Sequence, residues 1–76
     1  MRRDRLLQAL VRERFIVTLV NGETFDGLLD RFDGQHLELV DVRALPREAQ
    51  QQTAKVDGRL YVPRDRVAYM QRPDAT

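Results

Sequence analysis

Two short polar segments, residues 33–36 and 64–66, carry the side chains best suited to contact a ligand. The first contains Asp33, Gln35 and His36, and this histidine is the only one in the chain. An unperturbed imidazole titrates near neutral pH, and its flat ring can stack on a nucleic-acid base. The second segment contains Arg64 and Arg66, whose guanidinium groups can bind phosphate or stack on bases. These residue types therefore suit contact with a nucleic acid.

Each of these residues also has a simpler structural explanation. Asp33 begins an Asp-Gly pair, and for this residue the turn alone is the favoured interpretation. His36 is explained equally well as an ordinary strand residue beside a turn. Arg64 and Arg66 flank Asp65, and a solvated corner with Asp65 as the ion partner contributes little to stability.

The composition argues against catalysis and against a bound metal. The chain has no Cys, which excludes disulfides and thiolate zinc sites, and a single His disfavours a structural metal site. There is no Ser/His/Asp or Cys/His set and no phosphate-binding glycine loop. We therefore expect a protein without enzymatic activity and without a metal or other cofactor.

The length of the chain points to one domain that gains stability by association. A domain of 76 residues buries a modest core, and without disulfides or metal the remaining remedy is oligomerisation. The net charge is +1, with basic residues concentrated at the two ends and acidic residues in the middle. No apolar segment has the length of a signal peptide core or a membrane span, so we expect a cytoplasmic protein with no membrane partner.

The hydrophobic pattern predicts one helix followed by strands. Leu6, Leu7, Leu10 and Val11 recur at helical spacing, which predicts a short helix over residues 3–12. From Phe15 onward the period changes to two, and β-branched residues become frequent. The predicted strands span residues 15–20, 24–32, 36–42, 59–62 and 67–71.

Glycine-containing turns connect the first three of these strands. Asn21-Gly22 and Asp33-Gly34 are two-residue hairpin signals. Gly27 lies inside the second strand, where a glycine usually marks a bulge or bend. Three strands joined by two tight turns form a meander, and the bend lets the sheet wrap around its own apolar face.

The rest of the chain is predicted to complete a barrel. Residues 43–57 lose the alternating pattern and are interpreted as a solvated, variable loop, and residues 72–76 are a short tail. Pro63 cannot donate to a ladder and is expected to end the fourth strand. The predicted fold is all-β: a single domain with a five-stranded SH3-like barrel over about residues 15–71 and a short N-terminal α-helix.

Taken together, these strands resemble the first sequence motif of the Sm and Sm-like (LSm) family. That motif alternates apolar residues and then has a turn glycine, an aromatic, a second glycine, a leucine and an aromatic-Asp pair. The matching residues are Val17, Leu19, Gly22, Phe25, Gly27, Leu29, Phe32 and Asp33, continued by Leu37, Leu39 and Asp41. Residues 62–70 are similar to the second Sm motif. The resemblance implies an Sm-like barrel.

The resemblance also implies where RNA is bound. The family holds a uracil edge with an Asn shortly after the motif's Asp, and a nearby aromatic or His stacks on the base. This sequence has no Asn there, and Pro63-Arg64 stands where the family has Arg-Gly. The RNA-binding residues implied for this chain are Asp33, Gln35, His36, Arg64 and Arg66.

An oligomeric ring that binds single-stranded RNA, including uridine-rich sequences, is the leading functional hypothesis. The resemblance implies a homo-oligomer of five to seven subunits, in which Val62, Val67 and Tyr69 lie at or near the subunit interface. The alternative is a ring-forming assembly or adaptor protein without RNA binding, which the missing Asn favours. A monomeric peptide-binding barrel is weaker, because such grooves need several exposed aromatics.

Overall fold

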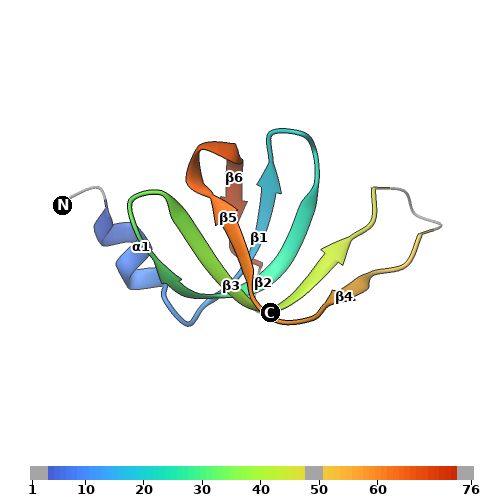
Figure 1. The fold of residues 1–76 in the computed structure, drawn as a ribbon, viewed down its shortest axis with the longest axis horizontal. Helices are drawn as coiled ribbons and strands as arrows, with labels where there is room; N and C mark the ends of the chain where they lie inside the picture. The colour runs from blue at the N-terminus through green and yellow to red at the C-terminus, as the bar shows by residue number, and fades with distance from the viewer. Residues whose placement is uncertain (1–3, 48–50, 74–76) are drawn as a thin grey trace.

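The fold is a strongly bent antiparallel sheet with a short helix at one end (Figure 1). The computed structural model describes residues 4–47 and 51–73 of the chain. The elements in chain order are α1 (Arg5–Leu10), β1 (Arg14–Leu19), β2 (Thr24–Phe32), β3 (His36–Leu45), β4 (Ala54–Val56), β5 (Leu60–Pro63), the 3-10 turn η2 (Arg64–Arg66) and β6 (Val67–Gln71).

The sheet has the order β4-β3-β2-β1-β6, and β5 also pairs with β3. Strand β3 is therefore long enough to pair with β5 through residues 36–39 and with β4 through residues 42–44. β5 and β6 lie at the two ends of this curved sheet, and among the described residues no ladder joins them. Each of these two strands thus keeps one unpaired edge.

The core lies on the concave side of the sheet. Alternation along the strands directs one set of apolar side chains inward, and Leu19, Phe25 and Phe32 are partly buried against that set. The fully enclosed residues come from four strands: Phe15, Val17, Leu29, Leu37, Leu39, Val42 and Val62.

Gly27 has the bending role that its position predicted. The register between β2 and β3 shifts opposite it, between Asp26 and Leu28. A Cβ atom at Gly27 would lie 3.1 Å from Cγ2 of Val42 and 3.3 Å from Cβ of Leu39. The absence of a side chain therefore lets β3 cross close over β2. At the first hairpin Gly22 has φ of 92°, as its turn requires.

Helix α1 is shorter than predicted. It spans Arg5–Leu10 instead of 3–12, residue 3 lies outside the described residues, and none of its residues is fully buried. Arg12 has φ of 75°, so the chain cannot continue as a helix. The Arg12 N–H donates to the Leu29 carbonyl at 2.6 Å, and the Leu29 N–H donates to the Glu13 carbonyl at 3.0 Å.

The predicted loop over residues 43–57 is wrong at both of its ends. β3 continues to Leu45, and Ala54–Val56 forms β4, with Val42 opposite Val56 and Arg43 opposite Lys55. The alternation in this arm uses small apolar residues next to charged ones, and so carries little hydrophobic signal. The predicted fourth strand corresponds to β5, and residues 57–59 separate it from β4, with Gly58 at φ of 80°.

Residues 72 and 73 are the described part of the predicted tail, and residues 74–76 lie outside the described residues. The Arg72 guanidinium binds the Glu13 carboxylate at 2.8 Å. Among the described residues, none of the helices has the length and apolarity that a membrane crossing requires.

Candidate nucleic-acid interface

The turn between β2 and β3 is built around the Asp33 carboxylate. Its Oδ1 atom accepts the backbone N–H groups of Gln35 at 2.8 Å and His36 at 2.7 Å. These two hydrogen bonds, the Gln35 bond first, lower the pKa of Asp33 below its ordinary value. An Asx turn of this kind fixes the local backbone. The turn therefore explains the contacts of one carboxylate oxygen of Asp33, the Oδ1 atom.

Arg64 connects the two polar segments that the sequence singled out. Its backbone N–H donates to the Gln35 carbonyl at 2.7 Å, and its Nη1 atom donates to the Asp33 carbonyl at 2.7 Å. Beside it, Pro63 pairs with His36 across the β3–β5 ladder. The structure therefore brings Asp33, Gln35, His36 and Arg64 together at one end of the sheet.

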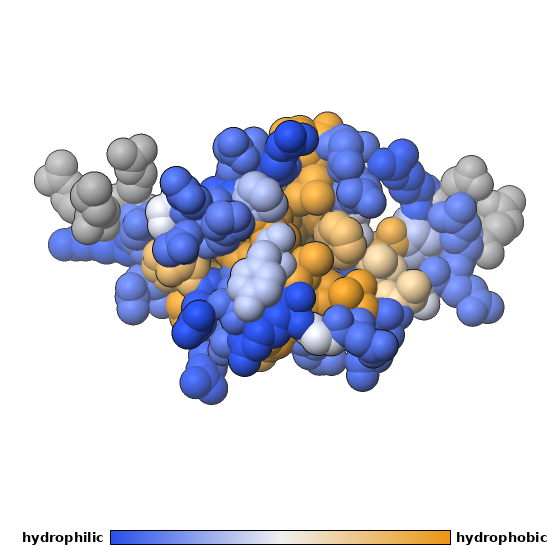
Figure 2. Space-filling model, in the orientation of Figure 1, coloured by the Kyte–Doolittle hydropathy of each residue, from blue (hydrophilic) through white to orange (hydrophobic). Residues whose placement is uncertain are grey.

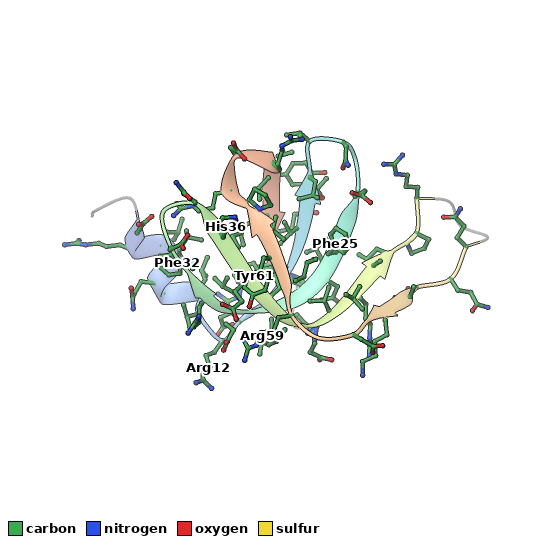
Figure 3. The ribbon with its side chains drawn as sticks, in the orientation of Figure 1. Arg12, Phe25, Phe32, His36, Arg59 and Tyr61 are labelled. Atoms are coloured by element: carbon green, nitrogen blue, oxygen red, sulfur yellow. The ribbon has the colours of Figure 1, made fainter. Side chains whose placement is uncertain are left out.

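His36 lies between two surface hollows. Its side chain is 47% exposed, so the ring is accessible to a partner. Figure 3 shows His36 and Tyr61 on neighbouring strands of the same region. One hollow is lined by Gly34, Gln35, His36, Pro63, Arg64 and Asp65. The other is lined by Arg31, Phe32, Asp33, His36, Glu38 and Tyr61.

Arg66 is not part of this cluster. Its backbone carbonyl accepts the Val20 N–H at 2.8 Å, which places it beside the β1–β2 turn, and it lines neither hollow at His36. The simpler structural interpretation of this corner had Asp65 as its ion partner. Within the described residues the ion partner of Arg64 is Asp4 instead, with 3.0 Å between Nη2 and Oδ1.

A charged row next to His36 was not predicted from the sequence. Register places Arg31, Glu38 and Tyr61 side by side on β2, β3 and β5. Glu38 is only 7% exposed, and its carboxylate binds Arg31 at 3.1 Å and Arg59 at 2.7 Å. A nearly buried carboxylate needs such partners. Single-strand alternation marks these residues as outward-facing, but only the cross-strand register shows that they meet.

Asp30 completes this charged row. Its carboxylate binds the Arg59 Nη1 atom at 2.7 Å, and the hydrogen bond from Arg59 lowers the pKa of Asp30. Arg59 is thus shared between two carboxylates, and the most accessible members of this face are the Arg31 side chain, 76% exposed, and Tyr61, 59% exposed.

The predicted interface residues divide into three environments. Val62 is 2% exposed and belongs to the core; its backbone pairs with Leu37 on β3, and its place at or near a subunit interface stays a prediction. Val67 packs against the core while remaining partly exposed. Tyr69 is 53% exposed on β6. On the face in Figure 2, apolar residues reach the surface in the middle of the molecule between hydrophilic flanks.

No protein-family model and no curated protein matches the chain. Solved structures do. A heptameric archaeal Sm protein superposes with a TM-score of 0.77 at 21% identity, covering 91% of this chain and 97% of the other. The SmAP1 heptamer of P. aerophilum gives a TM-score of 0.79 at 21% identity, covering 92% of this chain and 90% of the other. The chain has an Sm-like fold.

A third similar structure comes from a different kind of assembly. A chain in the crystal structure of the NatC complex bound to CoA gives a TM-score of 0.72 at 24% identity, covering 88% of this chain and 83% of the other. The predicted barrel class with its N-terminal helix is thus confirmed. Within this Sm-like fold, the β2–β3 turn and η2 carry residues of the candidate site that the two motifs predict.

Proposed function

We propose that this protein forms a homo-oligomeric Sm-like ring that binds single-stranded RNA through the β2–β3 turn and Arg64. The observation that carries the RNA site is the contact between the two segments: Arg64 donates to the Gln35 and Asp33 carbonyls beside the exposed His36. An aromatic ring beside an arginine is an arrangement that holds unpaired bases by stacking. The protein acts by binding and not by catalysis.

The ring is supported by the two unpaired strand edges. β5 and β6 each pair on one side only within the described residues, and exposed edges favour pairing with another chain. If β5 of one copy pairs with β6 of the next, the contact is head-to-tail, and such contacts form a ring when the rotation between successive copies closes. Two of the similar structures are heptamers.

Affinity for a fluorescently labelled oligouridylate tests the RNA site. We expect His36→Ala to weaken binding in fluorescence anisotropy by about 5- to 150-fold, which corresponds to the loss of one base stack worth about 1–3 kcal/mol. Arg64→Ala should weaken it in the same direction. Arg66→Ala is the matched control, because it removes the same charge from η2 outside the cluster.

The RNA affinity of each variant is compared with that of wild type only after light scattering shows that the variant has the same oligomer mass. Duplex RNA of the same length should bind more weakly than the single strand. Equal affinities for wild type, His36→Ala and Arg64→Ala would remove the proposed site.

A second candidate function is that of an assembly subunit without RNA binding. Two observations favour it: the similarity to a chain of the NatC complex, and the pairing of the Arg64 guanidinium with the Asp4 carboxylate. An intact oligomer that shows no RNA binding even at low salt, where phosphate attraction is strongest, would support this function over the first.

A further inference from the structure

The Asp4 carboxylate is the only acidic side chain bound to Arg64 in the described part of the chain. Asp4 directly precedes α1, far from Arg64 in sequence, and its Oδ1 atom lies 3.0 Å from the Arg64 Nη2 atom. Both side chains are mostly enclosed, with 28% of Asp4 and 25% of Arg64 exposed. This pair therefore attaches the start of the helix to the candidate RNA site.

The pair changes what the guanidinium can bind. Arg64 uses Nη1 for the Asp33 carbonyl and Nη2 for Asp4, while a guanidinium offers five N–H donors in all. Donors and the flat face thus remain for a base. A phosphate is disfavoured for two reasons. The adjacent Asp4 carboxylate already offsets the charge of the guanidinium, and the same carboxylate would repel the phosphate as a like charge.

We propose that Asp4 is a specificity-determining residue that makes Arg64 a base-contacting group and not a phosphate-binding group. Asp4 holds the guanidinium against the β2–β3 turn beside His36 and keeps phosphate away from it. The inference rests on the proposed RNA site. It gives the segment at the start of the helix a role in whether Arg64 contacts a base or a phosphate. Phosphate contacts add affinity for any sequence, whereas base contacts discriminate between sequences.

The test substitution is Asp4→Asn, which removes the charge and keeps an oxygen that can accept from Arg64. Binding of labelled oligouridylate and of a mixed-sequence strand of equal length is measured by anisotropy at about 50 and 200 mM salt. We expect Asp4→Asn to bind both strands about two- to fivefold more tightly at low salt, a gain typical of one partly exposed charge interaction. The ratio between the two strands should fall, and the salt slope should steepen by about 0.7, the value for one added phosphate contact on single strands.

Glu13→Gln is the matched control for bulk charge. Glu13 also pairs with an arginine, Arg72 at 2.8 Å, and neither residue lines the hollows at His36. Glu13→Gln should leave the RNA affinity, the affinity ratio between the two strands and the salt dependence near the wild-type values. A double variant, Asp4→Asn with Arg64→Ala, tests whether the effect acts through Arg64, since the gain should then disappear.

The outcomes separate this inference from the proposed function. Binding by wild type with no gain in Asp4→Asn, or an equal gain in Glu13→Gln, overturns the role of Asp4 and leaves the RNA site standing. A gain that persists without Arg64 also overturns it. Binding by Asp4→Asn alone overturns both, because wild-type Arg64 then contacts no base. No binding by either protein at low salt overturns both.

Discussion

Gly27 of β2 lies so close to Val42 of β3 that a Cβ atom at position 27 would be 3.1 Å from the Val42 Cγ2 atom. Val42 is fully buried, so it has little room to move. Gly27→Ala should therefore lower the free energy of unfolding by about 1–3 kcal/mol, the usual cost of overpacking a core. Urea unfolding at neutral pH measures this change.

Gly34→Ala is the control for this substitution. A Cβ atom at Gly34 would meet nothing within 4 Å, so the change should stay within about 0.5 kcal/mol of wild type. If the two alanine variants unfold at the same urea concentration, the close crossing of β2 and β3 is not what requires glycine at position 27.

The arm formed by β3 and β4 should contribute to stability, in contrast to a loop. Val56 packs against the core opposite Val42, and Val56→Ala should lower the free energy of unfolding by about 1 kcal/mol. Lys55→Ala, on the exposed face of the same strand, should change it by less than about 0.5 kcal/mol. Thermal or urea unfolding measures both, and a neutral Val56→Ala would mean that the arm does not stabilise the fold.

The protein should be an oligomer in solution. We expect light scattering at micromolar concentration to give a mass five to seven times that of the 8.9 kDa chain, because β5 and β6 each keep one edge unpaired within the described residues and such edges favour pairing with another chain. Tyr69→Lys should shift the population to smaller species, since Tyr69 is an exposed aromatic on β6.

Val20→Lys is the control, because Val20 is similarly exposed, at 61%, but lies in the β1–β2 turn. A wild-type protein that stays monomeric at these concentrations would rule out the ring.

Stability should fall as the pH drops through the acidic range. The hydrogen bond from Arg14 lowers the pKa of Asp41 in the folded state, and the turn N–H groups lower that of Asp33. A carboxyl whose pKa is lowered in the folded state stabilises the fold at pH values above its ordinary pKa of 3.8. This contribution is lost as the pH falls below 3.8 and through the lowered pKa of the folded state. Melting temperatures between about pH 7 and 3 should show the loss.

Asp41→Asn isolates one of these contributions. Asp41 has φ of 51°, a conformation that Asn tolerates well, so the backbone should be retained. The variant should be less stable than wild type at neutral pH and should lose less stability on acidification. A variant whose stability falls with pH as steeply as that of wild type would show that the Arg14–Asp41 pair does not contribute.

The strands that the sequence predicted well are those whose signals are local. Asn21-Gly22 and Asp33-Gly34 determine two hairpins within a few residues, and β1 and β2 carry strong apolar alternation. The β3–β4 arm was missed because the ladder pair beyond Val42 on the same face consists of two small residues, Ala44 and Ala54. Its pairing depends on contact across the sheet and has no strong signal in either segment alone.

The candidate site was predictable in its turn and not in its ion pairs. The two segments were found from residue type and motif position, and Arg64 indeed meets the Asp33 turn. The simpler interpretation of the corner paired it with the neighbouring Asp65, whereas Arg64 binds Asp4, which is distant in sequence and is brought close only by tertiary packing. The burial of Val62 was not predicted, because a residue on an edge strand can still point its side chain into the core.

The junction at Arg12 divides the protein into regions of different local stability. The reciprocal hydrogen bonds of Leu29 with Arg12 and Glu13 fasten the end of the helical segment to a fully buried strand residue, whereas α1 itself buries no residue completely. Under native conditions, amide hydrogens of Arg12 and Leu29 should exchange with deuterium on the timescale of global unfolding, and those of α1 much faster. The turns of α1 can then unwind between two attachments, the Asp4–Arg64 ion pair and the Arg12 junction, without loss of the barrel.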